Sequence, residues 1–190
     1  MWCSTRSPVE PVRARVPALA LALGLLLSAA QAFAHPELPG SRLQGEATLR
    51  YFGLRVYHAR LWTLPDYRVS QPIDQPLVLE LEYLRELKGP LIAERSLKEM
   101  RRGAQITDTQ AERWLAEMQR LFPDVKAGDR ISGQHLPGRG ARFWHNGQLT
   151  GQIDDPAFAR LFFGIWLASS TSEPEMRLAL LGQAGNGPGR

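Results

Sequence analysis

A regular alternation of apolar and acidic residues in the segment 77–87 constrains the fold more than any other stretch of the sequence. In LVLELEYLREL, Glu80 and Glu82 fall on one side of an extended chain. Four large apolar side chains fall on the other side: Leu77, Leu79, Leu81 and Tyr83. A period of two residues with this composition predicts a half-buried strand, with one face in the core and one polar face.

Three further segments have the composition of strands. The segment Leu43–Trp62 is predicted to be one long strand in which Gly45 and Gly53 are bend points. The segments 129–136 and 141–153 lie on either side of a turn signal at residues 137–140. Within the second of them, Asn146-Gly147 is a strong signal for a two-residue hairpin.

Four segments carry helical periodicity together with start or stop signals. The first predicted helix is Gly89–Arg102, and the second begins with a capping box of Thr109 and Glu112 and stops at Pro123. The third has Asp155 as its N-cap, directly before Pro156. The fourth begins with a capping box of Ser172 and Glu175 and ends at Leu181. Strands and helices therefore come in groups, in the order β-β-α-α-β-β-β-α-α. This grouping predicts an α+β domain in which helices are layered on one face of an antiparallel sheet.

The first 34 residues are predicted to be a cleaved secretory signal peptide. Three features of such a leader follow one another: the basic pair Arg13 and Arg15, the apolar run Val16–Ala30, and the small-x-small motif Ala32-Phe33-Ala34. The apolar run is short for a bilayer span, although an uncleaved anchor remains an alternative. Cleavage between Ala34 and His35 predicts a periplasmic or secreted protein without a stable membrane span.

The chain after the leader is expected to form one domain. Residues 35–42 are predicted to be a flexible mature N-terminus, residues 43–182 the folded domain, and residues 183–190 a disordered tail. The only cysteine, Cys3, lies in the leader, which excludes disulfides, thiolate catalysis and cysteine-ligated metals from the mature chain.

Charge and motif spacing argue against nucleic acid and metal as ligands. The leader holds three of the 23 basic and one of the 19 acidic residues, so the mature chain has a net charge of only +2. The segment LRYFGLRVYHARLW, residues 49–62, combines arginines with aromatic rings, but Tyr51 stands where an RNA-binding strand would have glycine. No two histidines have the spacing of metal ligands, and no cofactor is predicted. One alternative is copper chelation by the amine and imidazole of a mature N-terminal His35.

One charged pair in the predicted first helix has two interpretations. Arg95 and Glu99 are four residues apart and share a helical face with Ile92. They form either a surface ion pair or a polar group at the mouth of an apolar pocket.

Four segments in order resemble the bacterial chalcone isomerase-like family: GEATLRYFGLRVYHARLW, LELEYLRELKGPLIAERSLKEMRRG, ARFWHNGQLTGQI and FARLFFGIWLASSTSEPEMRLALLG. The resemblance runs from about Leu43 to Gly182 and implies an open-faced β-sandwich, a large antiparallel sheet covered by helices. Plant enzymes of this family close a chalcone into a flavanone. Their non-catalytic relatives bind fatty acids in the same cleft through an arginine and a tyrosine.

Several polar positions of the enzymes are not kept in this sequence. The resemblance places Phe52 at a catalytic threonine, Ile92 at a tyrosine, Glu99 at an asparagine and Met176 at a late threonine, with Arg42 nearest to the catalytic arginine. A carboxylate at Glu99 would repel a phenolate or a fatty-acid head unless Arg95 or Arg50 neutralised it. The resemblance therefore implies the fold more strongly than it implies chalcone cyclisation.

These arguments favour non-catalytic binding of a small apolar ligand, acyl or aromatic and fatty acid-like, in a cleft between sheet and helices. The candidate ligand-binding residues are Arg42, Arg50, Phe52, Tyr83, Ile92, Arg95 and Glu99. One alternative is an isomerase or intramolecular lyase with a different polar set, for which the best candidates are Arg50, Tyr83, Arg95 and Glu99. The other is a protein-interaction module that presents an exposed apolar patch.

Overall fold

The computed structural model describes Met1 and residues 34–184. Most of the predicted signal peptide, and the last six residues of the predicted tail, lie outside this described part.

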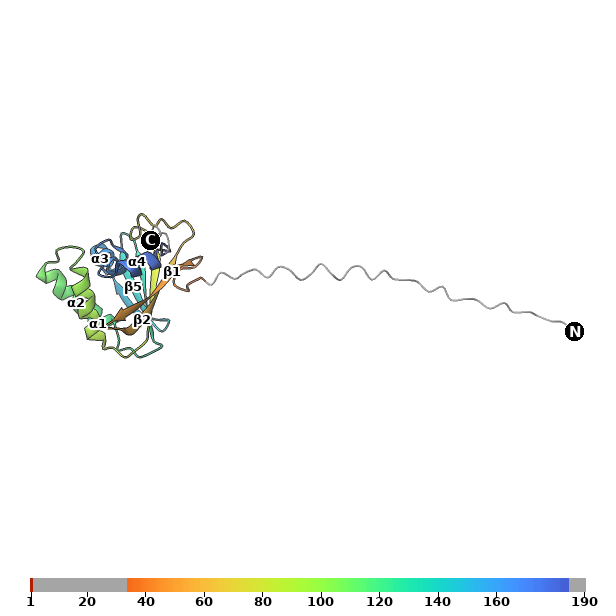
Figure 1. Ribbon diagram of the computed structural model, residues 1–190, viewed down its shortest axis with the longest axis horizontal. Helices are drawn as coiled ribbons and strands as arrows, with labels where there is room; N and C mark the ends of the chain where they lie inside the picture. The colour runs from red at the N-terminus through yellow and green to blue at the C-terminus, as the bar shows by residue number, and fades with distance from the viewer. Residues whose placement is uncertain (2–33, 185–190) are drawn as a thin grey trace. The chain divides into compact units, whose positions relative to one another are not determined.

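Six strands form one antiparallel sheet in the order β1-β2-β3-β4-β5-β6 (Figure 1). Their bounds are β1 Arg42–Tyr51, β2 Leu54–Thr63, β3 Leu77–Tyr83, β4 Arg130–Leu136, β5 Gly140–His145 and β6 Gln148–Ile153. Each strand pairs with its neighbour in sequence, although two helices interrupt the chain between β3 and β4. Because β3 and β4 still pair, the helical excursion must return across one face of the sheet.

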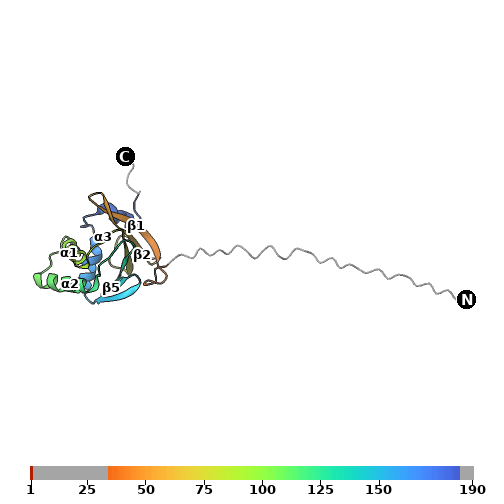
Figure 2. The same cartoon turned by 90° about the horizontal axis from the view of Figure 1, so that it is seen from below.

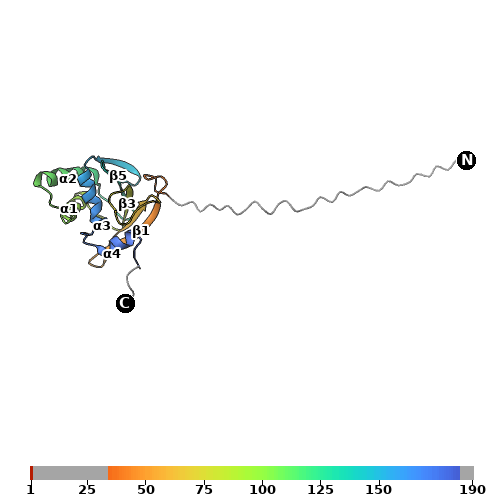
Figure 3. The same cartoon turned by 90° about the horizontal axis from the view of Figure 1, so that it is seen from above.

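Four helices pack on that face, as the two turned views show (Figures 2 and 3). Their bounds are α1 Gly89–Met100, α2 Asp108–Leu121, α3 Pro156–Leu167 and α4 Pro174–Leu180. Helix α3 lies on β4 and β5, and α4 lies on β1 and β2. Helix α1 packs against α2 and α3. The predicted fold class, an α+β domain with helices on one face of an antiparallel sheet, is confirmed.

The core between sheet and helices is built largely from aromatic rings. Phe162 of α3 contacts five other rings, at centroid distances of 5.1–5.9 Å: Phe122, Phe143, Phe158, Phe163 and Trp166. The sheet side of this core is the apolar face of β3 that the alternation predicts, since Leu77, Leu79 and Tyr83 are buried. Large rings fill space with few rotatable bonds, so they fix the position of α3 on the sheet.

The N-caps of α3 and α2 can be compared with the caps that the sequence predicts. The Asp155 carboxylate accepts hydrogen bonds from the backbone N–H groups of Ala157 and Phe158, as predicted for an N-cap. The predicted box of Thr109 and Glu112 is wrong, because α2 begins earlier and its capping box joins Thr107 to Gln110.

The predicted box of Ser172 and Glu175 is also wrong. The N-cap of α4 is Glu173, which makes no side-chain cap, and Pro174 begins the helix. Proline at the first helical position needs no hydrogen-bond acceptor for a backbone N–H, so the start is defined without a capping side chain.

The prediction of one long strand over Leu43–Trp62 is wrong, since the segment is the β1–β2 hairpin. Phe52 and Gly53 form its two-residue turn, with φ values of 47° and 78°. Both turn residues are in the left-handed region, as the twist of a tight hairpin requires. Strand β3 is also shorter than predicted, since it ends at Tyr83.

The predicted flexible segment 35–42 is instead ordered against the sheet. The backbone N–H of His35 donates to the Ser41 hydroxyl at 3.0 Å, and the N–H of Leu38 donates to the His35 carbonyl at 2.9 Å. His35, Leu38 and Ser41 are all buried, and Arg42 already belongs to β1. Burial of these side chains, which the polar and proline-rich sequence conceals, holds the segment in place.

Within residues 34–184, no helix is both long enough and apolar enough to cross a membrane.

Gly45 of β1 tests the contact between sheet and α4. A methyl group at Gly45 would lie 2.2 Å from the carbonyl oxygen of Ala179 and 2.5 Å from that of Leu180. Because backbone cannot move as a side chain can, Gly45→Ala is expected to lower the free energy of unfolding by about 1–3 kcal/mol in urea denaturation. The matched control is Gly103→Ala, whose new methyl would have the flexible Leu161 side chain as its nearest neighbour, at 3.3 Å, and would meet the Met100 carbonyl oxygen only at the ordinary contact distance of 3.5 Å. Equal stability of the two variants would contradict the close packing of α4 on β1.

Candidate functional site

A cavity of about 280 Å³ lies between the sheet and the helices. We call it the chamber. Its walls come from β1–β4, from the segment between β3 and α1, from α1 and α3, and from the segment that precedes α4. The lining residues are Leu49, Tyr51, Val56, Tyr57, Leu81, Tyr83, Arg85, Leu87, Leu91, Ile92, Arg95, Ser96, Glu99, Phe122, Ile131, Phe162, Ile165, Trp166, Ser172 and Glu173.

The chamber follows from how the helices pack. Helix α3 is held against β4 and β5 by the aromatic core, and α1 packs on α2 and α3. The space beneath α1, over β1–β3, is therefore left partly open. Its volume is near the lower limit of about 300 Å³ for small-molecule sites, so it suits a small or slender ligand.

Two tyrosines from neighbouring strands place phenolic groups in the chamber. Tyr57 of β2 and Tyr83 of β3 are direct partners in the sheet, with ring centroids 6.0 Å apart. The Tyr57 oxygen accepts a hydrogen bond of 2.9 Å from the indole N–H of Trp166 on α3. Among the described residues no acceptor is present for the Tyr57 or Tyr83 hydroxyl hydrogen. Both hydroxyls are thus free to donate to a ligand.

Burial keeps both phenols protonated. Desolvation raises the pKa of the Tyr57 hydroxyl far above its usual value, although the hydrogen bond from Trp166 opposes the shift. Desolvation likewise raises the pKa of Tyr83, and the neighbouring Tyr57 adds to the rise. At neutral pH the two groups therefore act as hydrogen-bond donors and cannot act as phenolate bases.

An ion pair on α1 lies at the mouth of the chamber. A guanidinium nitrogen of Arg95 lies 2.8 Å from Glu99 Oε1, and Arg102 Nε lies 3.7 Å from Glu99 Oε2. The Glu99 side chain is only 9% exposed, whereas Arg95 is half exposed and also lies over the Tyr51 ring, 5.7 Å from its centre. Of the two interpretations of Arg95 and Glu99, the polar group at the mouth of an apolar pocket is the one that the structure supports.

Charges around the mouth balance. Two arginines, Arg85 and Arg95, and two glutamates, Glu99 and Glu173, line the chamber, so it has no excess of positive charge. The arrangement offers apolar walls, two neutral donors and a compensated ion pair. It can orient an amphiphilic molecule by hydrogen bonds at one end.

The structure divides the predicted ligand-binding residues into two groups. Tyr83, Ile92, Arg95 and Glu99 line the chamber together. Arg42, Arg50 and Phe52 lie outside its lining.

The three residues outside the chamber lie on the exposed surface. Arg42 is exposed at the start of β1 and donates to the Pro65 carbonyl, while Phe52 is in the hairpin turn and is 88% exposed. Arg50 is exposed beside that turn. The resemblance places Phe52 and Arg42 at catalytic positions, and the prediction of one long strand gives no sign that Phe52 and Arg50 are at a turn.

Sequence reasoning missed Tyr57 and Trp166 as partners. Tyr57 stands on the same alternating face as Leu61, and Trp166 follows Phe162 by four residues on one helical face. The periodicity of the strand and of the helix therefore predicts that both side chains face the core. Their contact spans 109 residues and depends on the packing of α3, which no local pattern encodes.

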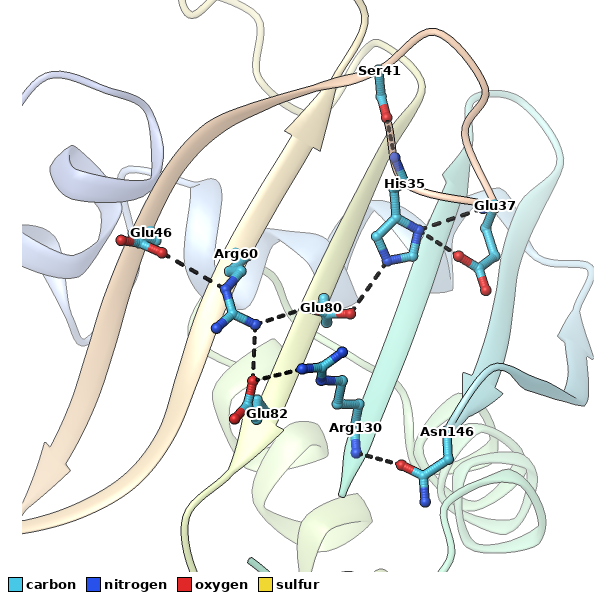
Figure 4. A network of polar contacts seen from close by, with 9 residues as sticks. All are labelled: His35, Glu37, Ser41, Glu46, Arg60, Glu80, Glu82, Arg130 and Asn146. Atoms are coloured by element: carbon cyan, nitrogen blue, oxygen red, sulfur yellow. Dashed lines mark hydrogen bonds and ion pairs between the residues drawn. The ribbon is translucent and has the colours of Figure 1, made fainter. Parts of the chain in front are cut away.

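The open face of the sheet carries a network of charged side chains (Figure 4). Arg60 of β2 lies 3.0 Å from carboxylate oxygens of both Glu80 and Glu82, and Arg130 of β4 lies 3.2 Å from Glu82. His35 contacts Glu37 and lies 3.5 Å from Glu80, which ties the start of the domain to β3. The acidic side of the alternating strand therefore binds arginines and a histidine.

Within residues 34–184, no cluster of three or more histidine, cysteine or acidic side chains has the geometry of a metal site.

Comparisons with known proteins bear on the same domain. Residues 38–182 match the model of the family described as chalcone isomerase-like. An uncharacterized protein of Haemophilus influenzae is 32% identical over 139 residues, which cover 73% of this chain and 67% of that protein. Among solved structures, a fatty-acid binding protein of Arabidopsis thaliana superposes with a TM-score of 0.61 at 13% identity, over 80% of this chain and 96% of that one. At 13% sequence identity, the similarity to the Arabidopsis protein shows the fold alone.

The network on the open face predicts a loss of stability in acid. The hydrogen bond with His35, followed by that with Arg60, holds the pKa of Glu80 below its usual value, and the hydrogen bond with Arg60 does the same for Glu82. A carboxylate whose pKa is lowered by folding stabilises the protein above its unfolded pKa of about 4.3, and this contribution disappears as the pH falls through the folded pKa.

Glu80→Gln is therefore expected to lower the free energy of unfolding by about 1–3 kcal/mol at pH 7. It should also flatten the decline below about pH 5, so that the two stability curves converge in acid. Denaturation midpoints measured from pH 7 to pH 2.5 check this, with Glu94→Gln on the exposed surface of α1 as the control. Curves for Glu80→Gln and wild type that stay parallel throughout would contradict the role of the network.

Proposed function

The chain belongs to the chalcone isomerase-like family, and we propose that it binds a small apolar ligand in the chamber without transforming it. The observation that carries the proposal is the composition of the chamber. Its walls are mostly aliphatic and aromatic, and among its hydrogen-bond donors are the hydroxyls of Tyr57 and Tyr83, which have no acceptor among the described residues. Such a site binds by burial of apolar surface and is oriented by a few polar groups.

The proposed ligand has a slender acyl or aromatic body. The volume of the chamber is at the small end of the range for ligand sites. The structural likeness to a protein described as fatty-acid binding supports an acyl chain. A chain of this kind would run along the apolar surface of Leu81, Ile92 and Ile165, all of which line the chamber.

The proposed head group accepts hydrogen bonds and carries no net charge. Two protonated phenols can donate to a carbonyl, ester or protonated carboxyl oxygen. Arg95 is already paired with Glu99, and the lining holds as many glutamates, Glu99 and Glu173, as arginines, Arg85 and Arg95. An ionised carboxylate would therefore enter a chamber without excess positive charge. Esters, amides and aldehydes should therefore bind at least as well as fatty-acid anions.

Loss of the enzymes' polar set supports binding over cyclisation. The resemblance places a catalytic threonine at Phe52, which lies in the exposed turn, and a catalytic tyrosine at Ile92, which has no hydroxyl. The Tyr57 and Tyr83 hydroxyls remain protonated, which leaves a substrate phenol without a phenolate base from these residues.

We also propose that the protein is exported and that Ala34–His35 is the processed bond. The leader pattern supports this, and the contacts of His35 with Ser41, Glu37 and Glu80 all lie on the mature side of that bond. Cleavage there would leave every one of these contacts in the mature protein.

Filling the chamber should abolish binding. Ile92→Trp adds a large ring to the lining, and its expected effect is a loss of at least about tenfold in affinity for a fluorescent acyl probe, because the apolar contact area is then occupied by protein. Titration of the probe and its displacement by a fatty acid and by the corresponding methyl ester provide the measurement. The methyl ester should displace the probe at least as well as the acid at pH 7.

Leu178→Trp is the control, because Leu178 is an exposed residue of α4 outside the chamber. It should bind the probe as the wild type does. Unchanged binding by Ile92→Trp would exclude the chamber as the site. A marked preference for the acid over the ester would retain the chamber but refute the uncharged head group.

Export predicts a defined mature N-terminus. When the full chain is expressed in a bacterium with a periplasm, the protein released by osmotic shock should begin at His35, as read by intact-mass and N-terminal peptide analysis. A variant in which Ala34 is replaced by the bulky residue Trp should accumulate unprocessed. Full-length wild-type protein that stays in the cytoplasmic fraction would contradict the proposal.

A further inference from the structure

The turn of the β1–β2 hairpin exposes large apolar side chains. We call residues 50–55 the hairpin tip. Phe52 is 88% exposed, Leu54 is 55% exposed and Tyr51 is 52% exposed. The rings of Tyr51 and Phe52 lie edge to face with centroids 4.6 Å apart. The tip therefore presents a contiguous apolar surface on a turn. Single exposed apolar residues are common on protein surfaces, but a contiguous apolar patch indicates an interaction site.

Phe52 occupies a backbone conformation that disfavours it. Its φ of 47° is in the left-handed region, where a bulky residue is an outlier. The same protein contains the same turn a second time, at Asn146-Gly147, with φ values of 50° and 80°. There the first residue is asparagine, which suits this conformation. Phenylalanine therefore occupies a turn position whose backbone conformation favours asparagine or glycine. This points to a role of the Phe52 side chain in binding something other than the rest of the domain.

Two arginines flank the exposed rings and face each other. Arg50 and Arg55 are direct partners across the hairpin, and both are exposed. Like charges directly opposite each other destabilise a hairpin. No acidic residue occurs between positions 47 and 65 to relieve the repulsion locally. An anion bound at the tip would relieve it.

The tip adjoins the mouth of the chamber. Tyr51 lines the chamber and carries the Arg95 guanidinium over its ring. Leu91 at the start of α1 is also exposed and also lines the chamber. Figure 1 shows the turn end of β1 and β2 beside α1. Whatever covers the tip therefore also covers the route into the chamber.

We propose that the hairpin tip docks on an anionic lipid bilayer. Phe52 and Leu54 enter the interfacial region while Arg50 and Arg55 contact lipid phosphates. Aromatic and aliphatic side chains next to arginines are the chemistry that binds this region of a bilayer. A narrow, convex two-residue turn suits insertion between headgroups, whereas stable protein interfaces are broad, with about 800 Å² buried on each partner. Docking in this orientation brings the chamber mouth to the membrane surface, where an apolar ligand can enter without crossing water.

Vesicle co-sedimentation tests the proposal. The chain is mixed with vesicles of phosphatidylcholine alone or of phosphatidylcholine mixed with phosphatidylglycerol. Binding is expected to the anionic vesicles and to be weaker on the neutral ones. Phe52→Asn should lower the partition coefficient about tenfold or more through loss of the inserted ring. The same variant should not lower the melting temperature, because it introduces asparagine, the residue that the second hairpin has at this turn position and that suits a positive φ. Loss of binding would therefore not reflect unfolding.

Two further variants separate charge from insertion. Arg50→Gln combined with Arg55→Gln should lower binding to anionic vesicles about fivefold for each arginine and leave binding to neutral vesicles unchanged. Leu149→Thr removes an exposed leucine from β6 and should bind as the wild type does. Ile92→Trp should also bind vesicles as the wild type does, so this test is independent of ligand binding in the chamber.

Several results would overturn the proposal. Wild-type protein that sediments with neither type of vesicle would end it, as would binding that Phe52→Asn leaves unchanged. Concentration-dependent self-association without lipid, abolished by Phe52→Asn, would assign the tip to a second copy of this chain instead.

Discussion

Helix α3 packs against β4 and β5 through a cluster of aromatic rings, and the place of the chamber follows from this contact. Phe162 is in contact with rings from α3, from the end of α2 and from β5, so the helix is fixed in position and rotation. Helix α1 then packs on α2 and α3, which leaves space above β1–β3. The aromatic core therefore creates the chamber beside it. It also sets the position of Trp166, whose indole N–H holds the Tyr57 oxygen.

This arrangement explains how a binding site can have the fold of the family's enzymes and a different chemistry. The Trp166 hydrogen bond orients Tyr57 and leaves its hydrogen free, while burial keeps both phenols protonated. Arg95 and Glu99 neutralise each other at the mouth. Donors without net charge can hold an acceptor oxygen in a low-dielectric site, but they leave the charge of a buried anion uncompensated, and burial of an unpaired charge is costly. The proposed ligand binding then depends on shape and hydrogen bonding.

The two hairpins show why sequence predicts part of this molecule and not the rest. Asn146-Gly147 and Phe52-Gly53 adopt nearly the same turn, but only asparagine signals it. The sequence therefore predicts mid-strand at Phe52, where the resemblance implies a cleft residue, and it does not show that Arg50 lies beside a turn. Ile92, Arg95 and Glu99 line the chamber together, and the sequence indicates their proximity because one helical face is a local property. The pairing of Tyr57 with Trp166 was missed because it arises only when distant segments pack. The fold class follows from the order of strands and helices. This order predicts the same class whether the segment of β1 and β2 is taken as one strand or as a hairpin.

Native mass spectrometry of the protein, purified without detergent from cells that express it, would show whether the chamber holds a ligand. Part of the wild-type protein should carry a non-covalent adduct, organic extraction should release a slender apolar molecule with an uncharged, oxygen-bearing head, and Ile92→Trp should carry none. If the wild-type protein shows only the mass of the bare chain under the same gentle conditions, from several expression hosts, the chamber is not a ligand site.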